Sequence, residues 1–331
     1  MSTGTLDPGR PLQLVADIGG THVRFALCTS VADIAHVSVL ERAEFTSLEH
    51  AIRQYLASVG QPAIAQAAIG IANPIVGDFV KMTNSSWEFS IRAMRLSLGL
   101  KDLHLINDFT ALALSLPHLP PEELVQVGGT SGVASAPSGL LGPGTGLGVS
   151  ALIPTQGQSW TALASEGGHS SFAPHTLHED MLWQEAHRQY GHVSMERLVS
   201  GPGLQFIYRT LCQIDGNKPH DYSPAQITAR AIDNSCACCR DALDTFCAAL
   251  GTAASDLALT LGARGGIYIG GGIVPRIVDY FISSPFRARF EDKGRFAEYL
   301  SAIPVFVITS PNPGLVGAAA YLQLVLRESQ K

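Results

Sequence analysis

The sequence predicts an α/β fold built from two domains, and three observations carry this prediction. Apolar runs with strand character alternate with segments of helical spacing along most of the chain. One local plan, a strand followed by a glycine and threonine turn and a second strand, occurs around Gly19-Gly20-Thr21 and again around Gly144-Thr145-Gly146. A length of 331 residues also fits two domains better than one. We therefore expect a duplicated architecture with one such turn in each half.

The first half has a fixed order of strands and helices. Runs rich in Val, Ile, Leu and Phe predict strands, and apolar residues at helical spacing predict helices. We expect strands at residues 12–18, 23–28, 36–41, 66–72 and 103–106, and helices at 47–59 and 110–116. Pro117 and Pro121 then interrupt the pattern, so a crossover to the second half is expected between them.

The second half repeats the strand plan and adds a long helical segment. Strands are expected at residues 139–141, 149–154, 160–164, 266–269 and 305–308. A mostly helical insertion is expected from about 178 to 261, and a final helix from 313 to about 327.

The two glycine turns are candidate phosphate-binding loops. Gly19, Gly20 and Thr21 predict a tight hairpin in which glycine accepts a positive φ. Glycines also let backbone N–H groups approach a phosphate closely. Asp17 lies at the mouth of this turn, where a carboxylate can hold Mg²⁺ through water. A hairpin without a ligand is the simpler interpretation, and it is compatible with phosphate binding.

A third glycine cluster follows the strand expected at 266–269. Gly270, Gly271 and Gly272 predict a flat surface without side chains, against which a nucleotide base or ribose could lie. Other nucleotide motifs are disfavoured. The chain has no Gly-Lys dipeptide, which excludes a Walker A loop, and its glycine spacing does not match the dinucleotide-binding fingerprint.

Asn107 and Asp108 end the apolar run 103–106. In open α/β sheets, ligands bind at the carboxyl ends of the parallel strands, so Asp108 is a candidate general base. The alternative is that Asp108 only caps the next helix, which we expect to begin near Thr110.

Composition limits the classes of partner. The chain is 46% hydrophobic and 15% charged, with a formal net charge of −6, which argues against nucleic acids and anionic membranes as partners. No apolar run approaches the roughly 20 residues of a membrane span. Residues 1–11 lack the features of a signal peptide, so we expect a cytoplasmic protein.

The six cysteines do not predict a disulfide framework or a zinc site. Cys236, Cys238 and Cys239 lie close together, but neighbouring residues of one helix point in different directions, whereas zinc needs convergent ligands. We therefore expect packed thiols and no bound zinc.

Several short motifs occur in a fixed order along the chain. They are Asp17-x-Gly-Gly-Thr21, Asn107-Asp108, Gly142-x-Gly-Thr-Gly146, Glu166-Gly-Gly-His169, Glu196-Arg-x-x-Ser-Gly-Pro-Gly203, Gly270-Gly-Gly272-Ile-Val-Pro-Arg276, Phe290-Glu-Asp-Lys-Gly-Arg-Phe296 and Asn312-Pro-Gly-Leu-x-Gly317. The motifs at 17–21, 107–108, 142–146 and 270–272 resemble the two phosphate motifs, the connecting motif and the adenosine motif of the actin/hexokinase superfamily. From about Leu12 onward, the chain resembles the bacterial glucokinase family.

The resemblance implies a fold and a domain organisation. It implies two ribonuclease-H-like α/β domains with a cleft between them and a helical insertion in the second. The first domain is expected to comprise residues 1–118 and about 310–331, because the final helix returns to it in that family. The second comprises residues 119–309. The family also implies a homodimer.

The resemblance further implies an activity, the ATP-dependent phosphorylation of D-glucose to glucose 6-phosphate, the first step of glycolysis, with Asp108 as general base. Glucose would be bound by Asn107, Asp108, Glu166, His169 and Glu196, with Asn73 as a weaker candidate. ATP would be held by Gly19, Gly20, Thr21, Gly144, Thr145, Gly146, Gly270, Gly271 and Gly272. Asp17 would hold Mg²⁺ through water.

Alternatives remain at each level. Glu166 could be a solvated turn acid, His169 a structural histidine and Glu196 a surface charge. The chain could phosphorylate another hexose or use another phosphate donor. It could also be a sugar sensor without catalysis. A sensor that regulates transcription would need a DNA-binding motif before Asp17, where only 16 residues are present.

Overall fold

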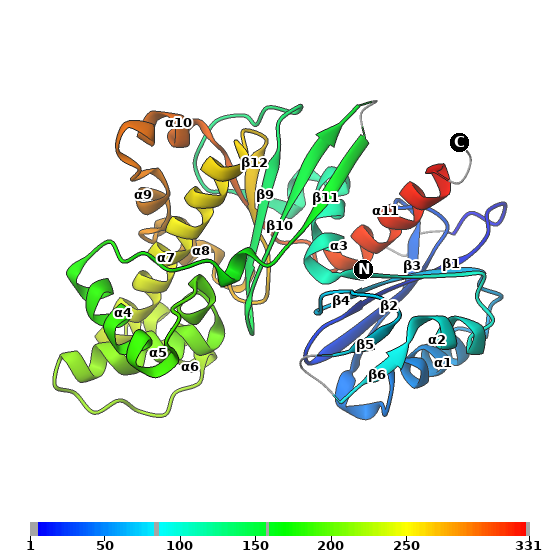
Figure 1. Cartoon of the computed structure of the whole chain (residues 1–331), viewed down its shortest axis with the longest axis horizontal. Helices are drawn as coiled ribbons and strands as arrows, with labels where there is room; N and C mark the ends of the chain where they lie inside the picture. The colour runs from blue at the N-terminus through cyan, green and yellow to red at the C-terminus, as the bar shows by residue number, and fades with distance from the viewer. Residues whose placement is uncertain (1–5, 83–85, 157–158, 329–331) are drawn as a thin grey trace. The chain divides into compact units, whose positions relative to one another are not determined.

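The computed structural model describes residues 6–82, 86–156 and 159–328 (Figure 1). Contacts divide the chain into two compact units. The first unit comprises Met1–Pro120, Trp160–Ala164 and Ser310–Lys331, and the second comprises Pro121–Ser159 and Ser165–Thr309. Each unit contains its own sheet and its own hydrophobic core, and each is described separately below.

The sheet of the first unit has five strands in the order β3-β2-β1-β4-β7. Their bounds are β1 Gln13–Ile18, β2 His22–Cys28, β3 Ile34–Glu41, β4 Gln66–Ile71 and β7 Asp102–Asn107. Strands β1, β4 and β7 are parallel, and β2 and β3 extend the sheet in antiparallel fashion. The five strands expected in this half of the sequence are confirmed.

Strand alternation gives this sheet two buried faces. Leu14 and Ile18 of β1 pack with Ile52 of α1 (Leu48–Ser58), which begins after the N-cap Ser47. Val15, between them on the opposite face, packs with Leu315 of α11 (Pro313–Glu328). The helix expected at 47–59 is confirmed as α1, and the final helix is confirmed as α11.

Helix α11 also packs closely along α3 (Asp108–Ser115), as Figure 1 shows. Gly317 makes this approach possible, because a Cβ at this position would overlap the backbone carbonyl of Ala111. One glycine of the Asn312-Pro-Gly-Leu-x-Gly317 motif is therefore a helix-packing residue. The close packing fixes where α3, and with it Asp108, begins.

Short elements of the first unit were not expected from the sequence. They are β5 Phe79–Lys81, β6 Glu88–Ser90 and α2 Ile91–Ser97. A strand of three residues is too short to show an alternating pattern, and α2 has only two turns. The start of α2 is nevertheless marked by Ser90, whose hydroxyl accepts a hydrogen bond from the Ala93 N–H.

The second sheet has six strands in the order β11-β10-β9-β12-β13-β8, and all of them except the edge strand β11, most of which is counted with the first unit, belong to the second unit. Their bounds are β8 Leu124–Gln126, β9 Ser138–Pro143, β10 Leu147–Thr155, β11 Ser159–Ser165, β12 Gly266–Ile269 and β13 Val305–Ile308. The five strands expected in this half are confirmed. The edge strand β8, which pairs with β13 in antiparallel fashion, was not expected.

The helical insertion is confirmed and consists of four α-helices. They are α4 Leu177–Tyr190, α5 Gly201–Ile214, α6 Pro224–Ile232 and α7 Ala237–Leu261. Three short helices that follow β12 were not expected: α8 Val278–Ser283, α9 Phe286–Glu291 and α10 Ala297–Ala302. Turns of 3₁₀ helix occur at Arg42–Glu44, Leu116–His118, Pro121–Glu123, Gly167–His169, Met195–Arg197, Val274–Arg276 and Gly294–Phe296.

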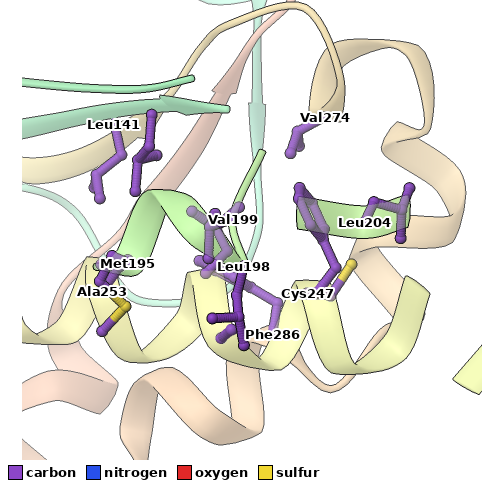
Figure 2. Packing of buried hydrophobic residues seen from close by; sticks show 14 of the residues in the cluster. Leu141, Met195, Leu198, Val199, Leu204, Cys247, Ala253, Val274 and Phe286 are labelled. Carbon is purple, nitrogen blue, oxygen red and sulfur yellow. The ribbon is translucent and has the colours of Figure 1, made fainter. Parts of the chain in front are cut away.

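Helix α7 is the central helix of the second core. Its Phe246 and Leu250 are fully buried, and the helix packs against α5, α6 and α9. Among the described residues it is the one helix that is long and apolar enough to cross a membrane. However, 72% of its most apolar 18-residue stretch is buried inside the protein. Its apolar composition is thus explained by its place in the core, where Cys247 and Ala253 lie among the packed side chains of Figure 2.

Candidate functional site

The parallel strands of the first unit end at a common level. Ile18 of β1 is paired with Ile71 of β4, and Ile71 is paired with Asn107 of β7. The segments that follow these residues therefore leave the sheet at the same edge, which is where open α/β sheets bind ligands. The candidate residues that the structure gathers at this edge are Asp17, Gly19, Gly20, Thr21, Asn73, Asn107 and Asp108.

The turn between β1 and β2 is a tight hairpin, as expected, but not for the expected reason. The Gly19 N–H donates to the His22 carbonyl at 3.0 Å. Neither Gly19 nor Gly20 adopts a positive φ, so the expectation on this point is wrong. A Cβ at Gly20 would meet no protein atom within 4 Å. The fold itself therefore does not require glycine at Gly20, and the space beside its backbone is open to a ligand.

Asp17 faces the side of the sheet that α11 covers. Its Oδ2 lies 3.2 Å from Nη1 of Arg24, its cross-strand partner in the hairpin. Burial raises the pKa of the Asp17 carboxyl, and the charge and hydrogen bond of Arg24 oppose that shift. A Cβ at Gly314 would lie 2.8 Å from the Asp17 Cγ, so the first turn of α11 lies directly against this carboxylate.

Arg24 and Gly314 were not expected to belong to this group. The hairpin register contained the signal for Arg24, because a connection of four residues at 19–22 pairs position 18 with position 23, and therefore position 17 with position 24. No local pattern could have placed Gly314 beside Asp17, because they are far apart in the sequence.

Asn107, not Asp108, is the N-cap of α3. The Asn107 Oδ1 accepts hydrogen bonds from the N–H groups of Phe109 at 2.9 Å and Thr110 at 3.1 Å. Helix α3 begins at Asp108 instead of near Thr110, and the alternative in which Asp108 is merely the cap is wrong. The cap is a different side chain, so the carboxylate of Asp108 is not needed for that purpose.

The orientation of the Asp108 carboxylate is fixed by its neighbours. Its Oδ1 accepts hydrogen bonds from the Asn107 Nδ2 at 3.1 Å and from the Phe109 N–H at 3.0 Å. Beneath it, a Cβ at Gly70 of β4 would lie 3.8 Å from the Asp108 Cα, so the helix start lies directly on the strand. Asn73, just beyond β4, donates from its Nδ2 to the Pro74 carbonyl at 3.1 Å.

The two glycine clusters of the second unit lie side by side. The turn between β9 and β10 closes with the Gly144 N–H donating to the Gly146 carbonyl at 2.8 Å. At the end of β12, the Gly272 N–H donates to the Pro143 carbonyl at 3.1 Å. A Cβ at Gly144 would have the Gly272 nitrogen, 3.9 Å away, as its nearest contact. Residues 142–146 and 270–272 thus form one surface that lacks side chains except for Pro143 and the exposed Thr145.

Gly271 and Gly272 of this surface differ in whether the fold itself requires a glycine. Gly271 has a φ of +80°, and a Cβ there would lie 2.5 Å from the Pro143 oxygen, so the close approach of the two strands requires glycine. A Cβ at Gly272 would meet nothing within 4 Å, and its φ is not positive. As at Gly20, the protein leaves open space where glycine is not needed for folding.

Glu196 is joined directly to the turn at 144–146. It lies in the 3₁₀ turn Met195–Arg197, and its Oε2 accepts a hydrogen bond from the Leu147 N–H at 2.8 Å. A Cβ at Gly146 would overlap the same oxygen, so the glycine provides the space for the carboxylate. Glu196 is half-buried and bonded to a backbone, which makes the interpretation as a free surface charge wrong.

The segment that carries Glu196 is anchored on the core. Met195, Leu198 and Val199 are buried beside α7, as Figure 2 shows. The Ser200 hydroxyl donates to the Glu196 carbonyl at 2.7 Å and also caps α5. The Gly201 N–H donates to the Gly144 carbonyl at 2.8 Å. The segment therefore holds the glycine turn at two points.

Glu166 and His169 lie next to the same turn. The His169 N–H donates to the Glu166 carbonyl at 3.0 Å within the 3₁₀ turn Gly167–His169, and Gly168 packs on the Leu147 carbonyl. The next residue joins this segment to the one that carries Glu196, through a hydrogen bond from Met195 N to the Ser170 carbonyl at 2.8 Å. The side chains of Glu166 and His169 are exposed.

The candidate residues consequently form two clusters, one in each unit. The cluster in the first unit combines two carboxylates, Asp17 and Asp108, with the open glycine turn at 19–21. The other combines carboxylates and a histidine with two glycine clusters. Open backbone beside oriented carboxylates is suited to phosphate groups and to polyhydroxylated ligands.

Comparison with known proteins places this geometry in a family. The model of the glucokinase family matches residues 14–325. A glucokinase of Chromobacterium violaceum is 55% identical over 322 residues, which are 97% of this chain and 92% of that protein. The crystal structure of a glucokinase from an Antarctic psychrotroph has a TM-score of 0.85 at 37% identity, covering 95% of this chain and 99% of that one.

More distant structures share the fold. The structure of a ROK family glucokinase from Streptomyces griseus, in complex with glucose and AMPPNP, has a TM-score of 0.64 at 19% identity and covers 94% of this chain and 98% of that one. Together with the two sheets described above, this similarity identifies the predicted two-domain α/β fold of the actin/hexokinase type. By its sequence over nearly the whole length, the chain belongs to the glucokinase family.

Proposed function

We propose that this protein transfers the γ-phosphoryl group of ATP to the 6-hydroxyl of D-glucose, with Asp108 as the general base. The observation that carries this proposal is the helix cap at Asn107, which leaves a separate, oriented carboxylate at the edge of the sheet. Membership of the glucokinase family supports the same reaction. The domains expected at 1–118 with 310–331 and at 119–309 are part of this proposal.

The role of Asp108 follows from the needs of phosphoryl transfer. Such a reaction depends on positioning and charge neutralisation more than on covalent catalysis. Asp108 would accept the proton of the sugar hydroxyl as the oxygen attacks the γ-phosphorus. The hydrogen bonds from Asn107 and Phe109 to its Oδ1 orient the carboxylate for this task.

Glucose recognition is assigned to amide, imidazole and carboxylate groups. A sugar hydroxyl both donates and accepts hydrogen bonds, and these groups complement it. We assign this role to Asn107, Asp108, Glu166, His169 and Glu196, with Asn73 as a further candidate. At Glu196 the Oε2 is engaged by the Leu147 N–H, so the sugar contact is assigned to Oε1.

ATP binding is assigned to the glycine clusters. Gly20 and Gly272 have open space where a Cβ would lie, and neither needs glycine for its backbone conformation. A phosphate or a ribose that approaches the backbone explains why no side chain stands there. Phosphates are assigned to Gly19, Gly20, Thr21, Gly144, Thr145 and Gly146, and adenosine is assigned to Gly270, Gly271 and Gly272.

Mg²⁺ fits the donor set at Asp17. Within the described residues no three His, Cys, Asp or Glu side chains gather to hold a metal ion. Mg²⁺ commonly uses one or two carboxylates and takes its other ligands from water and substrate phosphates. Asp17 would hold the ion through water, and bound Mg²⁺ would supply neutralisation of the phosphate charge.

The wider setting is also part of the proposal. We propose a soluble cytoplasmic enzyme of glycolysis that acts as a homodimer and has neither nucleic acid nor a membrane as partner. The net charge of −6 and the buried position of α7 support this setting.

A panel of substrates tests the proposed function. Purified protein is assayed with glucose, mannose, fructose and galactose, each with ATP, GTP or polyphosphate and with Mg²⁺. We expect the highest kcat/KM for glucose with ATP. A clearly higher value for another hexose or another donor would replace that part of the proposal. No turnover with any pair would favour a sugar-binding protein without catalysis.

A further inference from the structure

A group of cysteines lies at one end of α5 and α7, away from the residues assigned to the reaction. Cys212 is near the end of α5, Cys236 is the N-cap of α7, and Cys238 and Cys239 lie in its first turn. The Sγ atoms of Cys212 and Cys238 are 2.8 Å apart. A disulfide closes at about 2.05 Å, so a shift of less than about 1 Å would bring these two sulfurs to bonding distance.

The two sulfurs differ in exposure in a way that allows a stepwise reaction. Cys238 is partly exposed, whereas Cys212 is only 3% exposed. The expectation that all these thiols are packed away from solvent is therefore wrong for Cys236 and Cys238, which are both partly exposed. Burial and the neighbouring Cys212 and Asp215 raise the pKa of the Cys238 thiol.

The geometry favours a pair of sulfurs over a metal centre. Structural zinc needs four ligands that converge tetrahedrally. No such group of His, Cys, Asp or Glu, even of three members, is present in the part of the chain that the structure describes. The contact between Cys212 and Cys238 joins two helices that are held next to each other by their own packing.

We propose that Cys212 and Cys238 are a redox modification site, at which a low-molecular-weight disulfide such as oxidised glutathione forms a reversible intramolecular disulfide. The inference does not rest on the proposed kinase function, because it concerns only thiols that the reaction does not use.

The exchange balances in two steps. The partly exposed Cys238 loses its proton, and its sulfur attacks one sulfur of oxidised glutathione. The glutathione S–S bond breaks, a mixed disulfide forms on Cys238, and the first glutathione leaves as a thiol. Cys212 then loses its proton and attacks the Cys238 sulfur, which releases the second glutathione. The protein loses two protons and two electrons, and oxidised glutathione gains them as two thiols.

The bond would close the segment between Cys212 and Cys238, which are 26 positions apart and enclose α6. Closing a loop of this size in the unfolded chain is expected to stabilise the folded protein. The contact of α5 with the glycine turn is at its other end, at Gly201, about 16 Å along the helix. Kinase activity is therefore expected to change little on oxidation.

The test uses the full chain and reads mass, not activity. The reduced protein is incubated with oxidised glutathione, the remaining thiols are alkylated, and tryptic peptides are analysed by mass spectrometry. We expect a cross-linked peptide pair that contains Cys212 and Cys238, with the mass of two hydrogens lost and full reversal by dithiothreitol. The midpoint of urea unfolding should rise in the oxidised form.

Matched variants give the controls. Cys212→Ser and Cys238→Ser should each abolish the cross-link, and Cys236→Ser, at the same end of α7 and also partly exposed, should keep it. A cross-link that survives in Cys212→Ser or Cys238→Ser contradicts the proposal. So does glutathione that stays attached to the chain without a cross-link, or bound zinc that must be removed before any oxidation occurs.

Discussion

At the scale of single residues, Asn107 and Asp108 divide two tasks that one side chain often performs. Asn107 accepts the first N–H groups of α3, and Asp108 begins the helix with its Oδ1 held by two donors. A carboxylate that is oriented in this way, beside a different side chain that serves as the N-cap, can serve a reaction. This division underlies the assignment of Asp108 as the base.

We predict that Asp108→Asn lowers kcat by about 10²–10⁴-fold, because removal of a general base has this order of effect. Glucose affinity, measured by calorimetry, should stay within about one order of magnitude because the amide preserves shape and hydrogen bonding. Asp102→Asn, at the other end of β7, is the matched control. The Asp102 Oδ2 accepts a hydrogen bond from the Gln66 Nε2 at 3.0 Å. The Asp102→Asn substitution should leave kcat nearly unchanged. If Asp108→Asn retained most of its kcat, another group would be the base.

Glu196 is predicted to serve the sugar and the glycine turn together. Glu196→Gln keeps an oxygen that can accept from the Leu147 N–H, so it should raise the KM for glucose by about tenfold and leave the KM for ATP nearly unchanged. Glu196→Ala also leaves that N–H without its partner, so the KM for ATP should rise as well.

Glu166→Gln is the matched variant, because Glu166 is exposed and its turn packs on Leu147 through Gly168. It should raise the KM for glucose alone. Steady-state kinetics with each substrate varied in turn distinguish the cases. A normal glucose KM in Glu196→Gln would remove Glu196 from the sugar site, and a normal ATP KM in Glu196→Ala would show that the hydrogen bond does not position the turn.

The sequence predicts residues well where chemistry is local and poorly where it depends on distant contacts. Asp17, Asn107 and Asp108 follow apolar runs, so their places at the strand ends could be predicted. The bond between Glu196 and Leu147 spans 49 positions, and nothing near either residue indicates the other. The same holds for the buried ion pair of Glu179 and Arg289, whose Oε1 and Nη2 lie 2.8 Å apart across 110 positions.

At the scale of elements, two adjacent glycines after β12 provide a direct comparison. Gly272→Ala places a methyl group in open space, so we predict a thermal midpoint close to that of the parent protein and a raised KM for ATP. Gly271→Ala forces a Cβ against Pro143 at a φ of +80°, so it should unfold at a clearly lower temperature.

Differential scanning calorimetry and kinetics on the two variants separate folding from ligand binding. Gly60→Ala is a control for the backbone effect alone, since Gly60 has a φ of +87° but open space around it. A Gly272→Ala variant with an unchanged KM for ATP would mean that the open space at β12 does not receive the nucleotide.

Elements were predictable in proportion to their length. All the strands expected from apolar runs are present, helices α1 and α11 begin and end near the expected residues, and α7 ends at Leu261, where the helical insertion was expected to end. Strands β5, β6 and β8 have three residues each, which is too few for a pattern. Helix α3 begins two residues before the expected Thr110, because the cap is Asn107, a residue that also ends the strand.

At the scale of the whole molecule, we predict that the protein contains no structural zinc. In the cysteine group, the thiols of Cys212 and Cys238 contact each other as a pair. Cys236 and Cys238 are partly exposed. Protein purified without added metal and measured by inductively coupled plasma mass spectrometry should show far less than one zinc per chain. One zinc per chain would require these thiols to be reassigned as ligands.

The most direct test of the account is to identify the product of the reaction. The purified chain is incubated with glucose, ATP and Mg²⁺, and the products are followed by ³¹P nuclear magnetic resonance. We predict that glucose 6-phosphate and ADP form in equal amounts, and that the Asp108→Asn protein forms neither at a comparable rate. Phosphate that appears on another hydroxyl, or ATP that is hydrolysed without any sugar phosphate, would contradict the assignment of the reaction and of its base.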